Sequence, residues 1–111
     1  MSGITTHVLD TSRGRPAVGV PVALERAVDS GWRIVARGTT DDDGRVGDLL
    51  TSVVQAGRYR LTFDTAAYFH AVGDAGFYPE VSVTFVVGQG AEHYHVPLLL
   101  SPFGYSTYRG S

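Results

Sequence analysis

Short stretches in which apolar and polar side chains alternate constrain the fold of this chain more than any other feature of its sequence. A period of two places every second side chain on the same face of a strand. In residues 58–64, for example, Tyr59, Leu61 and Phe63 would point toward a core. Comparable stretches predict further strands at residues 4–9, 18–26, 32–38, 45–47, 79–87, 93–100 and 104–109.

The segment 65–72 is the one stretch that predicts a helix, with Asp64 or Thr65 as its N-terminal cap and Gly73 after its end. Seven or eight short strands with one short helix indicate an all-β protein with a β-sandwich architecture. At 111 residues, with no internal repeat or linker, we expect residues 1–111 to form a single domain. In the strand at 18–26, the side chains expected on the core side are Val18, Val20, Val22 and Leu24.

Composition excludes several classes of function. The formal net charge is −2, so the sequence shows no basic field that would attract nucleic acid or an anionic membrane. The chain has no cysteine, which excludes disulfides and thiolate chemistry. The sequence shows no signal-peptide pattern, and its longest apolar run, 96–100, is too short to span a bilayer. We therefore expect a cytoplasmic protein.

The strand at 93–100 carries an unusual outer face. Its core face would hold Tyr94, Val96, Leu98 and Leu100, whereas the opposite face would hold His93, His95, Pro97 and Leu99. A lone strand histidine is more often solvated or structural than catalytic. Here, however, His7 lies on the non-core face of another predicted strand, and an imidazole with an unperturbed pKa of about 6.5 suits proton transfer near neutral pH.

Other polar residues near these histidines have a structural and a functional interpretation. Arg45 follows an Asp-Gly turn, where it is either a solvated charge or a clamp for an anion or carbonyl. His93 is interpreted as supporting or structural. His93 and His95 could share a metal ion, but neither a cysteine nor a clear carboxylate completes the ligand set, so we expect neither metal nor cofactor.

Two motifs carry a resemblance to a known family. The run His-Tyr-His-Val-Pro at 93–97 and the ending Tyr-Arg-Gly-Ser at 108–111 are similar to the signature of 5-hydroxyisourate hydrolases, the transthyretin-related enzymes of urate breakdown. The resemblance covers residues 4–111. Weaker matches lie at residues 6–10, 16–20, 43–45, 56–59 and 77–79.

The resemblance implies a transthyretin-like β-sandwich that assembles as a homotetramer, a dimer of dimers, with active sites in a channel between the dimers. It also implies hydrolysis of 5-hydroxyisourate to 2-oxo-4-hydroxy-4-carboxy-5-ureidoimidazoline without a cofactor. The family's catalytic residues would fall on His7, Arg45, His95 and Ser111. Substrate would be bound by His7, Arg45 and Tyr108.

Two other functions stay open at this point. A transthyretin-like module could carry a small molecule without chemistry, and a structural or adhesion sandwich would share the alternation at 16–22. The sequence does not say which histidine is the general base. The apolar residues Leu9, Pro97 and Leu99 lie on predicted outer faces, so we expect that face to be a subunit interface.

Overall fold

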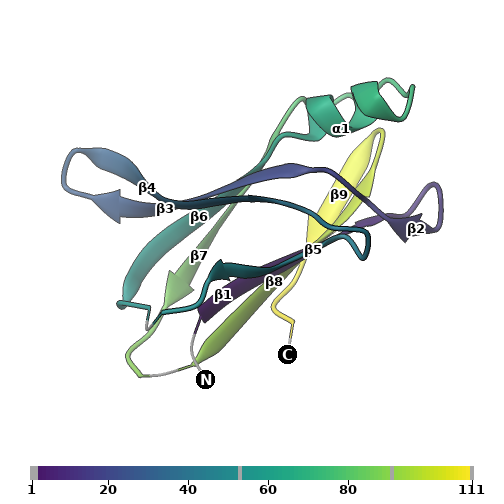
Figure 1. Ribbon diagram of the computed structural model, residues 1–111. Coiled ribbons are helices and arrows are strands. Elements are labelled where there is room, and N and C mark those ends of the chain that lie inside the picture. Colours follow the sequence, from purple (N-terminus) through teal and green to yellow (C-terminus); the bar gives the residue numbers. More distant parts are fainter. Residues whose placement is uncertain (1–2, 53, 91, 111) are drawn as a thin grey trace.

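The computed structural model describes residues 3–52, 54–90 and 92–110, which form two sheets packed as layers (Figure 1). One sheet has the strand order β2-β1-β8-β9, with β5 also paired to β1, and the other has the order β4-β3-β6-β7. The β-sandwich with one short helix predicted from the sequence is therefore confirmed. The elements are β1 (Gly3–Asp10), β2 (Arg15–Pro16), β3 (Pro21–Val28), β4 (Gly31–Thr39), β5 (Arg45–Leu50), β6 (Gly57–Phe63), α1 (Thr65–Ala71), β7 (Val81–Val87), β8 (His93–Ser101) and β9 (Gly104–Thr107).

The core lies between the two sheets and follows the alternation of the sequence. In β6, Tyr59, Leu61 and Phe63 are buried, as predicted. In β8 the even-numbered side chains from Tyr94 to Leu100 are likewise at most 6 % exposed. Full burial of a large apolar side chain contributes roughly 1.5–3 kcal/mol, so these positions fix which face of each strand points inward.

The alternation was misleading at the start of the second long strand. Val18 is 48 % exposed rather than buried, and β3 begins only at Pro21. Gly19 has a positive φ of 81°, so residues 18–19 form a turn that ends the alternation. The amide of Gly19 donates to the carbonyl of Thr40, which ties this turn to the chain after β4.

The short strand β2 was also missed, because no strand was predicted between residues 9 and 18. Arg15 and Pro16 pair with the end of β1, and two residues are too few to show alternation. The last strand is shorter than predicted, since β9 ends at Thr107.

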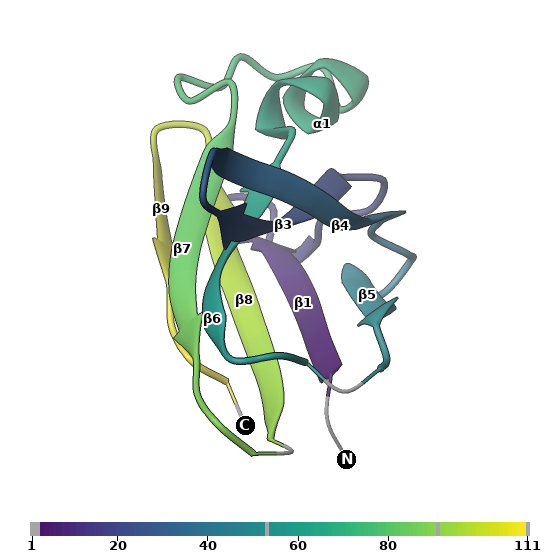
Figure 2. The ribbon, with the colours of Figure 1, turned by 90° about the vertical axis from the view of Figure 1, so that its left-hand side faces the viewer.

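Helix α1 lies across one end of the sandwich (Figure 2). Asp64 caps it by accepting a hydrogen bond of 3.0 Å from the amide of Ala67, and Gly73 follows it with a φ of 75°, as the sequence predicted. No helix in the described residues is long and apolar enough to cross a membrane.

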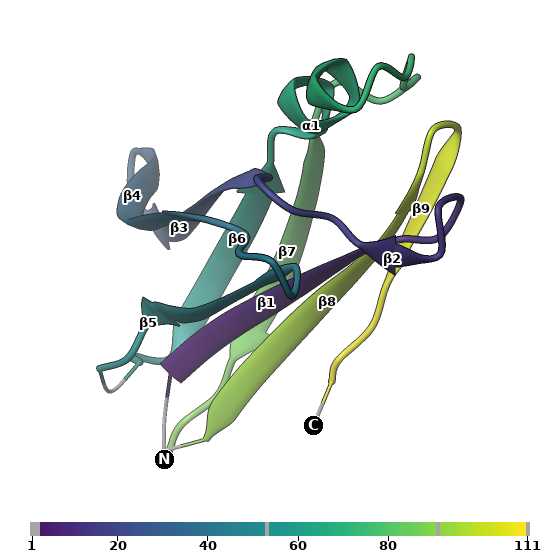
Figure 3. The ribbon, with the colours of Figure 1, turned by 45° about the vertical axis from the view of Figure 1, so that its right-hand side comes forward.

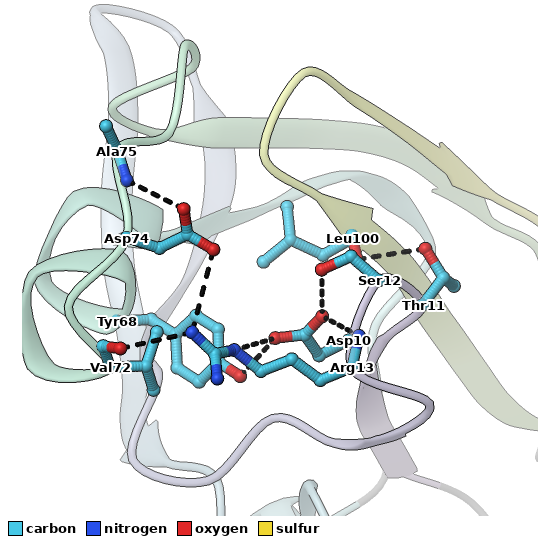
Figure 4. A network of polar contacts seen from close by, with 9 residues as sticks. All are labelled: Asp10, Thr11, Ser12, Arg13, Tyr68, Val72, Asp74, Ala75 and Leu100. Carbon is cyan, nitrogen blue, oxygen red and sulfur yellow. Dashed lines mark hydrogen bonds and ion pairs between the residues drawn. The ribbon is translucent and has the colours of Figure 1, made fainter.

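A buried carboxylate joins this helix to β1 (Figure 4). Asp10 is 1 % exposed and accepts hydrogen bonds from the hydroxyl of Tyr68 at 2.5 Å, from Ser12 Oγ at 2.9 Å and from the amide of Arg13 at 3.0 Å. Burial of the Tyr68 hydroxyl and its hydrogen bond to Asp10 raise the pKa of Tyr68 to about 12. The carboxylate therefore depends on its donors rather than on water.

We expect Tyr68→Phe to lower the free energy of unfolding by about 2 kcal/mol, because it deprives a buried carboxylate of a donor. Urea denaturation followed by circular dichroism measures this change. Tyr105→Phe is the matched control, because Tyr105 is 45 % exposed. An equal, small effect of both substitutions would contradict the structural role of the Asp10 network.

The pairing of β1 with β8 determines what lies on the outer face of the larger sheet. These strands run parallel, with Thr5 opposite His95 and His7 opposite Pro97. On its other edge β1 pairs antiparallel with β5, which sets His7 opposite Arg45. Figure 3 shows β5, β1 and β8 side by side.

Candidate active site

Three neighbouring strands bring the predicted histidines and arginine to one face. On β1, Ile4, Thr6 and Val8 are fully buried, so Thr5 and His7 point to the outer face. The rings of His7 and His95 lie with their centroids 6.4 Å apart. Arg45 is the β5 partner of His7. The structure therefore brings together His7 from β1, Arg45 from β5 and His95 from β8.

Arg45 and His95 border a small pocket. It has a volume of about 220 Å³ and is lined by Thr5, Thr6, Arg45, Gly47, His93 and His95. A larger open groove of about 690 Å³ crosses β3, β4 and β6, but no histidine lines it. Because imidazoles supply proton transfer near neutral pH, the smaller pocket is the better candidate for chemistry.

The position of Arg45 is fixed by the turn before it. The carboxylate of Asp41 accepts hydrogen bonds from the amides of Asp43 and Arg45, at 2.9 and 3.0 Å. Gly44 has a positive φ of 75°, and a Cβ there would lie 2.5 Å from the carbonyl oxygen of Val8. This glycine lets the turn pack against β1, so that Arg45 begins β5 directly beside His7.

Burial and the nearby guanidinium favour the neutral form of the two imidazoles. Partial burial lowers the pKa of both His7 and His95, and the positive charge of Arg45 lowers both further. A hydrogen bond to the carbonyl of Asp43 raises the pKa of His7 but offsets only part of this decrease. Neutral imidazoles can accept a proton or donate an N–H hydrogen bond.

We expect the free energy of unfolding to decrease as the pH falls from 7.5 to 5.5. The unfolded histidines, with a pKa of 6.5, take up protons before the folded ones, whose pKa is lower. The unfolded state then binds more protons, so acid favours it below about pH 6.5. Urea denaturation across this range should show a weaker pH dependence in a His7→Gln/His95→Gln protein. An identical dependence in both proteins would contradict the lowered pKa values.

Sequence reasoning missed Thr5. Its Oγ1 lies 2.7 Å from Nδ1 of His95 and 3.0 Å from Nε2 of His93. The signal was available in part, because Thr5 shares its predicted strand face with His7. What could not be predicted is the parallel register that sets Thr5 opposite His95.

Within the described residues, no group of three or more His, Asp or Glu side chains is placed to hold a metal ion.

The end of the chain passes directly beside His95. The amide of Gly110 donates to the carbonyl of His95 at 2.8 Å, and a Cβ on Gly110 would lie 2.6 Å from Cδ2 of the imidazole. A glycine is therefore needed for this close approach. Ser111, the expected catalytic residue, lies outside the described residues.

Tyr108 is placed differently from the histidines. It is 56 % exposed and lines a groove of about 250 Å³ beside β7, together with Thr107 and Arg109, rather than the histidine pocket. Arg109 lies 4.7 Å from the centroid of the Tyr94 ring and pairs with Glu92 at 3.4 Å. Within one chain, the structure thus does not bring Tyr108 to His7 and His95.

Residues 4–110 match the model of the HIUase/Transthyretin family. The chain belongs to this family. Among its relatives, the 5-hydroxyisourate hydrolase of Salmonella typhimurium is 48 % identical over 109 residues, which cover 97 % of this chain and 80 % of the relative.

Solved structures of HIUase/Transthyretin proteins include two close matches with different names. The 5-hydroxyisourate hydrolase of Klebsiella pneumoniae superposes with a TM-score of 0.88 at 39 % identity and covers 99 % of this chain and 100 % of that one. Sea bream transthyretin in complex with thyroxine superposes with a TM-score of 0.90 at 35 % identity and covers 96 % of this chain and 93 % of that one. The fold is therefore transthyretin-like, but likeness of backbone does not separate a hydrolase from a carrier.

Proposed function

We propose that this protein is a 5-hydroxyisourate hydrolase of urate breakdown, with one catalytic domain over residues 1–111. The observation that carries the proposal is that His95 and Arg45 line one pocket while His7, the strand partner of Arg45, has its ring centroid 6.4 Å from that of His95. The name and 48 % identity of the Salmonella typhimurium relative support it. A carrier site would be mainly apolar, whereas this pocket is lined by Arg45, two histidines and two threonines.

The proposed reaction opens the six-membered ring of the substrate at a cyclic amide. The oxygen of water bonds to the ring carbonyl carbon and gives up its proton to an imidazole. The C–N bond then breaks, the nitrogen takes a proton, and the carboxylate and ureide of 2-oxo-4-hydroxy-4-carboxy-5-ureidoimidazoline result. His7 and His95 supply the proton transfer, and Arg45 stabilises the oxyanion through its guanidinium donors. No metal or cofactor takes part in the proposed reaction.

Tyr108 and Ser111 belong to the proposal as groups that complete the site, with Tyr108 binding substrate and Ser111 in the catalytic set. The contact of Gly110 with His95 supports a role for the chain end, because it holds residue 110 against the histidine. The proposed cytoplasmic location can be checked by fractionating the cells that produce the protein.

We also propose that the protein forms a homotetramer. The outer face that carries the histidines also carries Leu9 and Leu99, which are half-buried in the single chain, whereas Pro97, which was also expected on an exposed interface, is already buried within one chain. In the described chain, β7 and β9 each pair on one edge only, and Val86 on β7 is 72 % exposed. An unpaired strand edge and apolar surface favour association.

We expect sedimentation equilibrium at micromolar concentration to give about four times the chain mass of 11.9 kDa. Replacement of Leu99 by Glu should lower the apparent mass, because a charge would have to be buried in the interface. Glu in place of Ile34 is the matched control, since Ile34 is exposed on the other sheet. A monomer in the parent protein would contradict the tetramer.

One assay tests the proposed activity. Hydroxyisourate is generated fresh from urate, and its ultraviolet decay is followed with and without the protein. We expect decay far above the spontaneous rate, with formation of the ureidoimidazoline. Binding of the substrate without faster decay would instead support the carrier.

A further inference from the structure

The Thr5 hydroxyl is placed between two imidazoles of β8. Its contacts to Nδ1 of His95 and Nε2 of His93 are both short enough for hydrogen bonds, at 2.7 and 3.0 Å. Thr5 and His95 are half-buried, whereas His93 is exposed. The hydroxyl therefore links two imidazoles that both line the pocket, one exposed and one half-buried.

The number of protons restricts how these contacts can form. A threonine hydroxyl donates one hydrogen bond, so it cannot donate to both rings. For both contacts to be hydrogen bonds, at least one imidazole must donate its N–H to Thr5. A neutral imidazole carries a proton on one nitrogen only, so the direction of each bond decides which nitrogen of that ring is bare.

We infer the directions from the difference between the two distances. Hydrogen bonds from N–H to oxygen are most often about 2.9–3.0 Å long, whereas those from a hydroxyl to oxygen are most often about 2.7–2.8 Å, so we assign the hydroxyl proton to the shorter contact. The 3.0 Å contact fits donation from Nε2 of His93 to Thr5. The 2.7 Å contact fits donation from Thr5 to Nδ1 of His95. His95 then carries its proton on Nε2.

We propose that Thr5 and His93 are positioning residues that hold His95 in the tautomer with Nδ1 bare and Nε2 protonated. This inference rests on the proposed hydrolase function and deepens it. This tautomer divides the roles of the two histidines: instead of sharing the proton transfer, His95 contributes an N–H donor to the oxyanion, beside Arg45. The bare nitrogen that takes the proton of water belongs to His7, which returns that proton to the leaving nitrogen.

The expected consequence is specific to the hydroxyl. Thr5→Val keeps the shape of the side chain but removes its donor and acceptor, so His95 should sample both tautomers. We expect kcat to fall about 10- to 100-fold, as for other residues that orient a functional histidine, while KM changes little. Thr5→Ser restores the hydroxyl and should recover most of kcat.

The deciding measurement is long-range ¹H–¹⁵N correlation of the imidazoles in ¹⁵N-labelled protein at pH 7.5. Protonated and bare ring nitrogens resonate well apart, so the spectrum identifies each tautomer. The parent and Thr5→Ser proteins should show His95 with Nε2 protonated and Nδ1 bare, and Thr5→Val should show a mixture. Thr11→Val is the control, because Thr11 donates to the carbonyl of Leu100 rather than to a histidine, and it should match the parent in spectrum and kcat.

Two results would overturn the inference: a parent spectrum with Nδ1 of His95 protonated, or a Thr5→Val protein whose His95 signals match the parent, whatever its kcat. Failure of the proposed function looks different. A parent protein without hydrolysis would refute the hydrolase, while its ring nitrogens would still report the tautomer. An active parent with the opposite tautomer would refute the role of Thr5 alone.

Discussion

Alanine at His7, Arg45 or His95 should lower kcat/KM for hydroxyisourate hydrolysis about 100- to 10,000-fold while the protein stays folded. Removal of a proton-transfer group or an oxyanion donor typically costs this much. The three side chains lie on the outer face of the sheet, so their loss opens no cavity in the core. The ultraviolet decay assay gives the rates, and circular dichroism verifies the fold.

The matched controls lie on other surfaces of the same protein. His70 is exposed on α1 and Arg37 on β4, so alanine at either should leave kcat/KM within about twofold of the parent. Parent rates in all three site variants would refute the assignment. A loss in the Arg45 variant alone would keep the pocket but remove the histidines from the chemistry.

Deletion of residues 108–111 should abolish hydrolysis while the melting temperature stays within a few degrees. β9 ends at Thr107 and the buried core stops at Leu100, so the truncated protein keeps both sheets. The deletion removes the contact of Gly110 with His95 and the ion pair of Arg109 with Glu92. Exposed ion pairs contribute little to stability, whereas an error of about an ångström in substrate position can cost 100-fold in rate.

Two point variants separate the contributions of this segment. Gly110→Ala should impair hydrolysis, because the added Cβ would lie 2.6 Å from the imidazole of His95 and force one of them to move. Glu92→Ala removes the same ion pair without touching the chain end, and it should keep the parent activity. Full activity in the truncated protein would remove Tyr108 and Ser111 from the proposed site.

The sequence predicted which face of a strand is buried better than it predicted which strands and residues pair. Alternation identified the buried side of β6 and β8 because burial of apolar side chains decides which face points inward. It failed at Val18, where the positive φ of Gly19 breaks the period. A local pattern carries no information on such a turn until the chain around Thr40 is placed against it.

The candidate site shows the same division. Single side chains suited to chemistry, His7, Arg45 and His95, could be chosen from residue type and strand face. Thr5 could not be chosen in this way, because its hydrogen bond to His95 depends on the register of β1 against β8. Register between distant strands depends on the whole sandwich. Tyr108 was predicted in the strand at 104–109, but the structure places it after β9, where it lines the groove beside β7.

The parallel pairing of β1 with β8 has a consequence for how the protein is made. The partners Gly3 and His93 belong to the first and last thirds of the chain, so this part of the sheet closes a very long loop. During synthesis β1 can pair with β5 but must wait for β8, and its second edge stays open meanwhile. Such distant pairings form slowly, so a pause in translation before β8 would prolong a state with an unpaired central strand, which is prone to aggregate.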